Sequence, residues 1–150
     1  MLQLAGLSRS FFCLDTKEFF LVKQINPMGS NPLNLAIRFL LEVTALITFG
    51  IWGWYTGNPG WLPYAMAIGI PTVAAVIWGI FNVPDDPSRS GNAPVVVPGV
   101  IRLIIELAFF ALATWALYDL GYSRMSIVFG VVAVLHYLVS YDRIIWLLKR

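Results

Sequence analysis

Two pairs of oppositely charged residues stand inside strongly apolar runs of this chain. Arg38 and Glu42 belong to the run IRFLLE, and Arg102 and Glu106 belong to the run IRLIIE. Residues four apart share one face of a helix, so each Arg can pair with its own Glu. An ionisable side chain at the centre of a membrane span costs about 2.5–3.5 kcal/mol on insertion scales. Such residues are therefore expected to face protein, where they can form ion pairs or hold a proton or small ion.

A lone histidine is predicted to lie close to these pairs. His136, Ser140 and Arg143 are spaced i, i+4 and i+7 and share one helical face. At about 1.5 Å per residue, His136 reaches the depth of the two glutamates near mid-membrane. Two nearby carboxylates would titrate as a coupled pair, and the imidazole could pass protons to them. The predicted polar cluster consists of Arg38, Glu42, Arg102, Glu106, His136, Ser140 and Arg143.

Two interpretations of this cluster stay open. In the first, the charges are structural and fix helix register, because lipid supplies no hydrophobic drive for helices to associate. In the second, they line a polar cavity for a proton, an ion or a small anionic ligand. A weaker third option, a lipid-acting enzyme with His136 as base, would need a nucleophile or metal that the sequence does not offer beyond Ser140 and tyrosines. Neither an enzyme, a cofactor nor a metal site is therefore expected.

The elements that must position these residues are long apolar helices. The chain has 150 residues, of which 59% are hydrophobic and 12% charged, about half the usual charged share of a soluble domain. A membrane span needs about 20 apolar residues, and four runs meet that length: 33–56, 61–82, 99–119 and 125–148. The sequence predicts an all-α membrane bundle of four helices. Expected partners are membrane lipids, a second copy or another membrane protein, and no nucleic acid, since the net charge is only +2.

The basic residues predict the orientation. Four spans place both termini and the loop 83–98 on one side, which carries most of the Lys and Arg, whereas Arg124 stands alone on the other. The positive-inside rule then puts both termini in the cytoplasm. Residues 1–27 do not resemble a signal peptide, so we interpret them as either an extension before a true start at Met28 or a short surface helix. The membrane domain is predicted to span 28–150.

Offsetting the chain by 64 residues aligns Arg38 with Arg102 and Glu42 with Glu106. The two predicted hairpins therefore resemble two copies of one unit. Because each copy has two spans, the copies would be parallel and related by a pseudo-twofold axis along the membrane normal. This repeat predicts that the two glutamates lie near each other and that the two arginines do so too.

The loop 82–99 reads NVPDDPSRSGNAPVVVPG and is rich in turn-forming residues. Its hydroxyls and guanidinium could bind a phosphate or a lipid headgroup. The alternative is an ordinary connector in which an aspartate is held against Arg89. The candidate residues are Asp85, Asp86, Ser88, Arg89 and Ser90.

Four segments carry a recognisable pattern: NPLNLAIRFLLE (31–42), WGIFNVPDDPSRSG (78–91), APVVVPGVIRLIIEL (93–107) and LHYLVSYDRIIWLL (135–148). Together they resemble the YrdB-like family of small bacterial membrane proteins with four spans. The resemblance covers about 31–148 and implies a bacterial cytoplasmic-membrane location, but it implies no activity. It also implies a shared polar set comprising Arg38, Glu42, Arg89, Arg102, Glu106, His136, Asp142 and Arg143.

Overall fold

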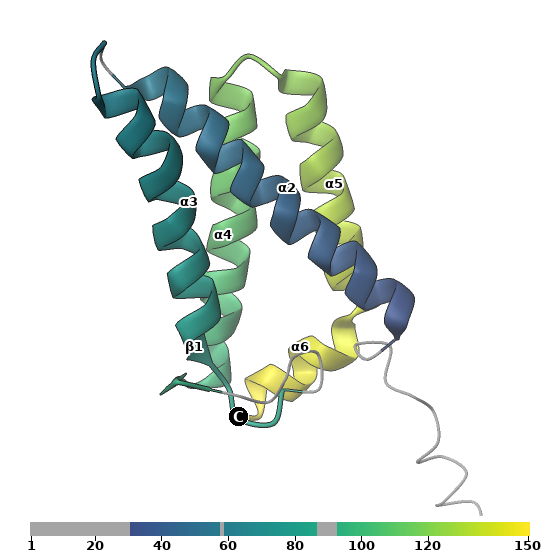
Figure 1. Ribbon diagram of the computed structural model, residues 1–150. Coiled ribbons are helices and arrows are strands. Elements are labelled where there is room, and N and C mark those ends of the chain that lie inside the picture. Colours follow the sequence, from purple (N-terminus) through teal and green to yellow (C-terminus); the bar gives the residue numbers. More distant parts are fainter. Residues whose placement is uncertain (1–30, 58, 87–92) are drawn as a thin grey trace, which may run out of the picture.

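The computed structural model describes residues 31–57, 59–86 and 93–150, which are mostly helical (Figure 1). The predictions made for residues 1–27 and for Ser88, Arg89 and Ser90 lie outside the described residues. The elements in chain order are α2 (Pro32–Thr56), α3 (Leu62–Ile80), β1 (Phe81–Asn82), β2 (Val95–Val96), α4 (Gly99–Asp119), α5 (Ser123–Val139) and α6 (Tyr141–Leu148).

Local chemistry explains how the long helices begin and how they satisfy their polar groups. The side chain of Asn31 accepts a hydrogen bond from the amide of Leu33 at 3.0 Å, and Pro32 stands in the first turn of α2, where its missing N–H is not needed. Threonines within the apolar helices donate to the carbonyl four residues earlier, so their hydroxyls need no water. These threonines are Thr44, Thr48, Thr72 and Thr114.

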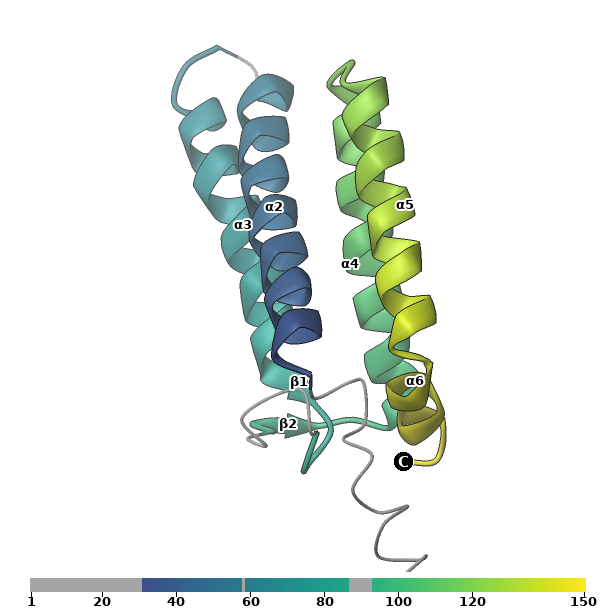
Figure 2. The same cartoon turned by 90° about the vertical axis from the view of Figure 1, so that its right-hand side faces the viewer.

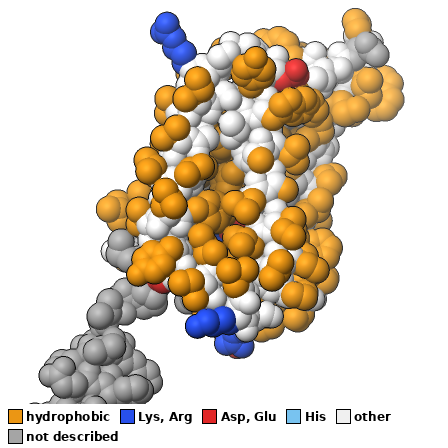
Figure 3. All heavy atoms as spheres, turned by 180° about the vertical axis from the view of Figure 1, so that it is seen from behind, with side chains coloured by type: hydrophobic (Ala, Val, Ile, Leu, Met, Phe, Trp, Pro, Cys, Tyr) orange, Lys and Arg blue, Asp and Glu red, His pale blue; other side chains and the backbone are white. Residues whose placement is uncertain are grey.

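Helices α2, α3 and α4 are each long and apolar enough to cross a membrane, and α5 with α6 adds a fourth span if the bent pair is counted as one. Large hydrophobic side chains are exposed along all of them, and Figure 3 shows such side chains, in orange, over one face of the molecule. Helix α3 buries Trp78 and leaves most of its other side chains exposed or half-exposed. Such a surface is typical of a membrane protein, because water would not tolerate so large an apolar area.

The predicted continuous span over 125–148 is wrong in one respect. The helix breaks at Ser140, whose φ of −94° and ψ of 30° leave the helical region, and α6 turns by 69° from α5. After the bend α6 runs below the other helices (Figure 1). Its buried residues, Arg143 and Leu147, are four apart and so share the face that points into the protein.

The helices form two hairpins, α2–α3 and α4–α5, with α2 also packed against α4 (Figures 1 and 2). We call the end with the two hairpin turns the hairpin end, and the end with α6, β1 and β2 the loop end. A core of aromatic rings lies between the hairpin end and the loop end. The rings of Phe49 and Phe109 meet edge to face with their centres 5.4 Å apart, and the ring centres of Trp78 and Phe109 are 4.6 Å apart. Such contacts hold helices together where hydrophobic drive is absent.

The loop end is closed by a short parallel strand pair and by α6. Phe81 pairs with Val95 and Asn82 pairs with Val96. The backbone of Gly99, at the start of α4, lies directly against the carbonyl of Leu147 in α6, and a Cβ on Gly99 would collide with that carbonyl. The close approach of α4 and α6 therefore requires glycine at this position.

We expect Gly99→Ala to lower the free energy of unfolding by about 1–3 kcal/mol, because the added methyl group pushes α6 from α4. Gly79→Ala is the matched control, since a Cβ there meets nothing within 4 Å. The measurement is thermal unfolding in detergent together with the rate of proteolysis within α6. Equal behaviour of the two variants would contradict the contact.

Candidate functional site

The carboxylate of Glu106 in α4 is the centre of the polar site and is 0% exposed. Its Oε1 accepts hydrogen bonds from Arg38 Nη2 at 2.8 Å, Arg102 Nε at 2.9 Å and Arg143 Nη2 at 2.8 Å. Its Oε2 accepts from Arg143 Nη1 at 2.7 Å and from the Tyr137 hydroxyl at 3.1 Å. Arg143 therefore grips both oxygens in the bidentate geometry that makes such pairs strong. We call these five residues the arginine cluster.

Arg102 joins the arginine cluster to the end of α3. Its Nη1 donates to the carbonyls of Trp78 at 2.8 Å and Phe81 at 2.7 Å. The last carbonyls of a helix lack partners within the helix and carry partial negative charge, so a guanidinium is favourable there. The Arg102 guanidinium also lies 4.5 Å from the centre of the Trp78 ring, and that of Arg38 lies 5.5 Å from it. Trp78 is thus held between the aromatic core and two cations.

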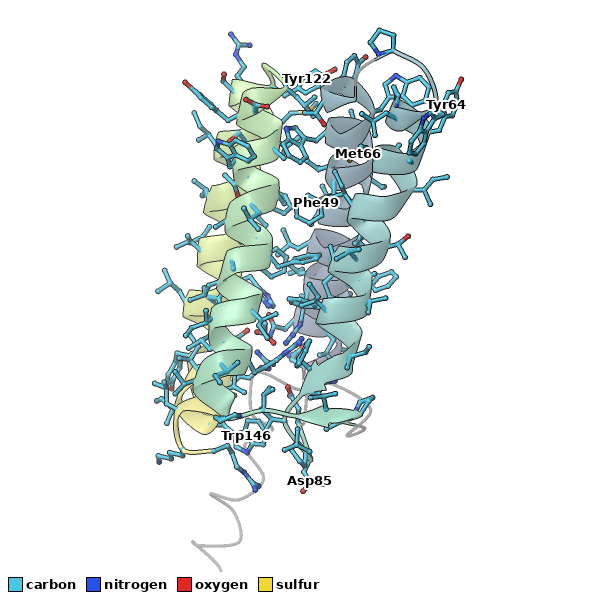
Figure 4. All side chains as sticks on the ribbon, turned by 90° about the vertical axis from the view of Figure 1, so that its left-hand side faces the viewer. Phe49, Tyr64, Met66, Asp85, Tyr122 and Trp146 are labelled. Carbon is cyan, nitrogen blue, oxygen red and sulfur yellow. The ribbon has the colours of Figure 1, made fainter. Side chains whose placement is uncertain are left out.

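Arg143 joins the arginine cluster to the loop after β1. Its Nη2 donates to Asp86 Oδ2 at 2.7 Å, and Asp86 is buried. Asp85 before it is exposed, has a φ of 60°, and projects from the loop end (Figure 4). Of the two candidate aspartates of this loop, only Asp86 therefore turns inward. The Asp86–Arg143 contact was not foreseen, because the sequence offers no signal that joins this loop to α6.

The charges of this region balance. Arg38 donates through Nε to Glu42 at 3.0 Å, so three arginines meet three carboxylates, those of Glu42, Asp86 and Glu106. Removing charges from water is costly, and it is sustained only where each ion is paired and hydrogen-bonded. Balanced pairing explains how these ions persist among apolar helices.

The two glutamates, which the internal repeat predicts to be equivalent, have different surroundings. The Glu106 side chain is fully buried, whereas the Glu42 side chain is 20% exposed and, among the described residues, accepts a hydrogen bond from Arg38 alone. The cross-helix pair is Arg38 with Glu106, and the reciprocal pair of Arg102 with Glu42 does not form in the described structure. The repeat itself stays a prediction.

His136 and Ser140 lie beside the arginine cluster. Ser140 accepts a hydrogen bond from Asn34 Nδ2 at 2.7 Å, which joins the start of α2 to the bend between α5 and α6. Asn34 was not foreseen, since a single Asn at the end of an apolar run carries no distinctive pattern. His136 is buried, and its Nδ1 has no hydrogen-bond partner in the part of the chain that the structure describes. The predicted relay from His136 to the glutamates is therefore not formed by direct hydrogen bonds.

The arrangement favours ionic fastening over ligand binding at Glu106. A carboxylate offers about four lone-pair sites, and five hydrogen bonds already reach this one. Among the described residues, no three His, Cys, Asp or Glu side chains come together in a way that could hold a metal ion.

Comparison with known proteins places the chain in a family. The family described as "Protein of unknown function (DUF2568)" matches residues 36–134. The "Uncharacterized protein YrdB" of Bacillus subtilis (strain 168) is 44% identical over 120 residues, which cover 80% of this chain and 97% of that protein. No solved structure matches the chain. The similarity that the Arg–Glu runs and the flanking segments indicated is confirmed, and the chain belongs to the YrdB-like DUF2568 family of unknown function.

Proposed function

We propose that this chain is a non-transport accessory or scaffold protein of the bacterial cytoplasmic membrane, and that its buried charges are structural. The observation that carries the proposal is the saturation of Glu106, which is sealed from the surroundings and bonded by three arginines and Tyr137. A site that binds and releases solute needs acceptor atoms that are free to bind the solute. Both carboxylate oxygens of Glu106 are occupied while its hydrogen-bond donors stay in place.

The cost of opening the arginine cluster supports this proposal. Each hydrogen bond to a charged group contributes about 1.5–3 kcal/mol. Removing one partner of a buried ion pair costs about 3–5 kcal/mol, because the other charge stays buried. A transport cycle through Glu106 would have to break several such bonds at once. The same bonds suit a fastener that holds α2, α4, α5, α6 and the loop after β1 together.

The proposed topology has four spans, with α5 and α6 as one broken span and both termini in the cytoplasm. In support, Lys149 and Arg150 are exposed at the loop end, and Arg124 is exposed near the hairpin end. The positive-inside rule favours the loop end as cytoplasmic. The proposed partner is another membrane protein or a second copy of this chain, and the proposal assigns no catalytic step.

Glu106→Gln and Glu42→Gln form a matched pair that tests the structural role. We expect Glu106→Gln to lower the free energy of unfolding by about 3–5 kcal/mol, since three arginines lose their shared anion. Glu42→Gln, at a partly exposed pair, should cost about 1 kcal/mol or less. Thermal unfolding in detergent and size-exclusion profiles measure both. Equal stability of wild type and Glu106→Gln would contradict the proposal.

A second candidate function, proton handling, is favoured by two observations. The Glu42 side chain is partly exposed, and the buried His136 has an Nδ1 without a partner among the described residues. Ionisable residues within spans commonly mark ion pathways. Their side chains are not joined by a hydrogen bond in the described structure, so a proton path through them would need water between them.

Proton flux in reconstituted vesicles separates the two functions. We expect vesicles holding the wild-type chain to dissipate an imposed pH gradient at the rate of protein-free vesicles, because the arginine cluster closes the loop end. The readout is the fluorescence of an entrapped pH dye. Faster decay that disappears in Glu42→Gln and in His136→Gln would replace the scaffold proposal with the proton pathway.

A further inference from the structure

A lateral groove runs between α3 and α4, with α2 at its back. It has a volume of about 560 Å³ and is lined by apolar side chains from the three helices. Phe49 of α2 lies between α3 and α4 (Figure 4). On the face opposite α2, Figure 3 shows apolar side chains on both sides of a hollow. The groove is separate from the arginine cluster, none of whose five residues lines it.

The dimensions of the groove suit a chain that lies parallel to the helices. It extends from Ala65 to Trp78 on α3 and from Ile105 to Ala116 on α4, which is about 20 Å and about 17 Å at the helical rise. One leaflet of a bilayer has a hydrocarbon depth of about 15 Å, half of the core. At the loop end the groove reaches Trp78, which packs on Phe109 at 4.6 Å. From Trp78 the groove extends toward the hairpin end. It is longer than the hydrocarbon depth of one leaflet, so one lipid tail fits along it.

The chemistry of the lining selects an apolar occupant. No charged side chain lines the groove, and the indole N–H of Trp52 is already given to Asp119 at 2.9 Å. Apart from the indole N–H groups of its tryptophans, the lining offers no polar side chain, so polar atoms placed along the groove would lose most of their hydrogen bonds. A linear hydrocarbon chain suits this narrow apolar groove, because it places no polar atoms between α3 and α4.

The mouth of the groove carries a negative charge beside aromatic rings. Asp119 stands one turn beyond Ala116 and is exposed, and its Oδ1 has no hydrogen-bond partner among the described residues. Trp52 and Trp115 pack edge to face at 5.3 Å, and Trp115 is half exposed. A carboxylate next to exposed aromatic faces favours an ammonium group and disfavours a second anion.

We propose that this groove is a phospholipid site, in which one acyl chain lies between α3 and α4 and an ammonium headgroup meets Asp119 at the hairpin end. A scaffold needs no particular lipid, so this inference goes beyond the proposed function. Lipid binding at this site would depend on the apolar shape of the groove and on charge complementarity at its mouth. The arginine cluster takes no part in it.

Two glycines of α3 provide a matched pair for the test. A Cβ at Gly69 and one at Gly79 would each meet nothing within 4 Å, but only Gly69 lines the groove. Gly69→Leu therefore fills the groove without a backbone collision, and Gly79→Leu adds the same side chain elsewhere on the same helix. Both replace a helical glycine, so their effects on helix propensity should be alike.

The experiment is native mass spectrometry of the full chain in detergent with phosphatidylethanolamine or phosphatidylglycerol of identical acyl chains. We expect the wild type and Gly79→Leu to retain one phosphatidylethanolamine, and to prefer it about five- to tenfold over phosphatidylglycerol. Gly69→Leu should lower retention of both lipids about tenfold or more. Asp119→Asn keeps an acceptor for Trp52, so it should retain lipid but lose the preference between headgroups.

Two results would overturn the proposal. One is equal lipid retention by Gly69→Leu and Gly79→Leu, and the other is equal binding of the two lipids by the wild type. If Gly69→Leu fails to insert, Ala108→Leu narrows the same groove from α4 and decides in its place. The result of this lipid-binding test is independent of the stability test with the Glu106 variants, because all chains used here keep the arginine cluster intact.

Discussion

One buried carboxylate, that of Glu106, holds together parts of the chain that are far apart in sequence. Its hydrogen-bond donors come from α2, α4, α5 and α6. Apolar side chains that face lipid gain little by facing each other instead, so helix packing in a membrane depends on close fit and on polar contacts. A shared anion is well suited to this, because moving α2 or α6 away would leave the arginine of that helix without its partner Glu106. The packing at the loop end of the molecule therefore keeps each arginine of the cluster in contact with Glu106.

The same dependence on close fit and on polar contacts explains why α3 packs unevenly against its neighbouring helices. Close backbone contact at Gly53, where a Cβ would collide with the carbonyl of Met66, holds α3 to α2. The bonds from Arg102 to the carbonyls of Trp78 and Phe81 fix its other end. Between these attachments α3 is not drawn against α4, and the groove is the space that remains. The groove is therefore a consequence of how α3 is fastened at both of its ends.

Spacing along the sequence was a good guide to contacts within one helix and a poor guide to contacts between elements. The pairs Arg38–Glu42 and Arg102–Glu106 follow directly from a separation of four residues, and both form. The convergence on Glu106, by contrast, depends on how helices cross, which no local pattern records. The bend at Ser140 was missed because no Pro or Gly, the usual signals of a break, stands near it in the sequence. What bends the chain there is a set of contacts made only in the folded protein, at Asn34, Asp86 and Gly99.

The two Arg–Glu units differ because each arginine needs an acceptor besides the shared one. Glu106 serves all three arginines, and each has a further acceptor from a different source. For Arg38 it is Glu42 on its own helix, for Arg102 it is the carbonyl end of α3, and for Arg143 it is Asp86 in the loop. Glu42 is thus one of three secondary acceptors rather than a second centre, which accounts for its partial exposure. Loss of a secondary acceptor leaves its arginine on Glu106, whereas loss of Glu106 leaves three cations to repel one another in a medium of low dielectric constant.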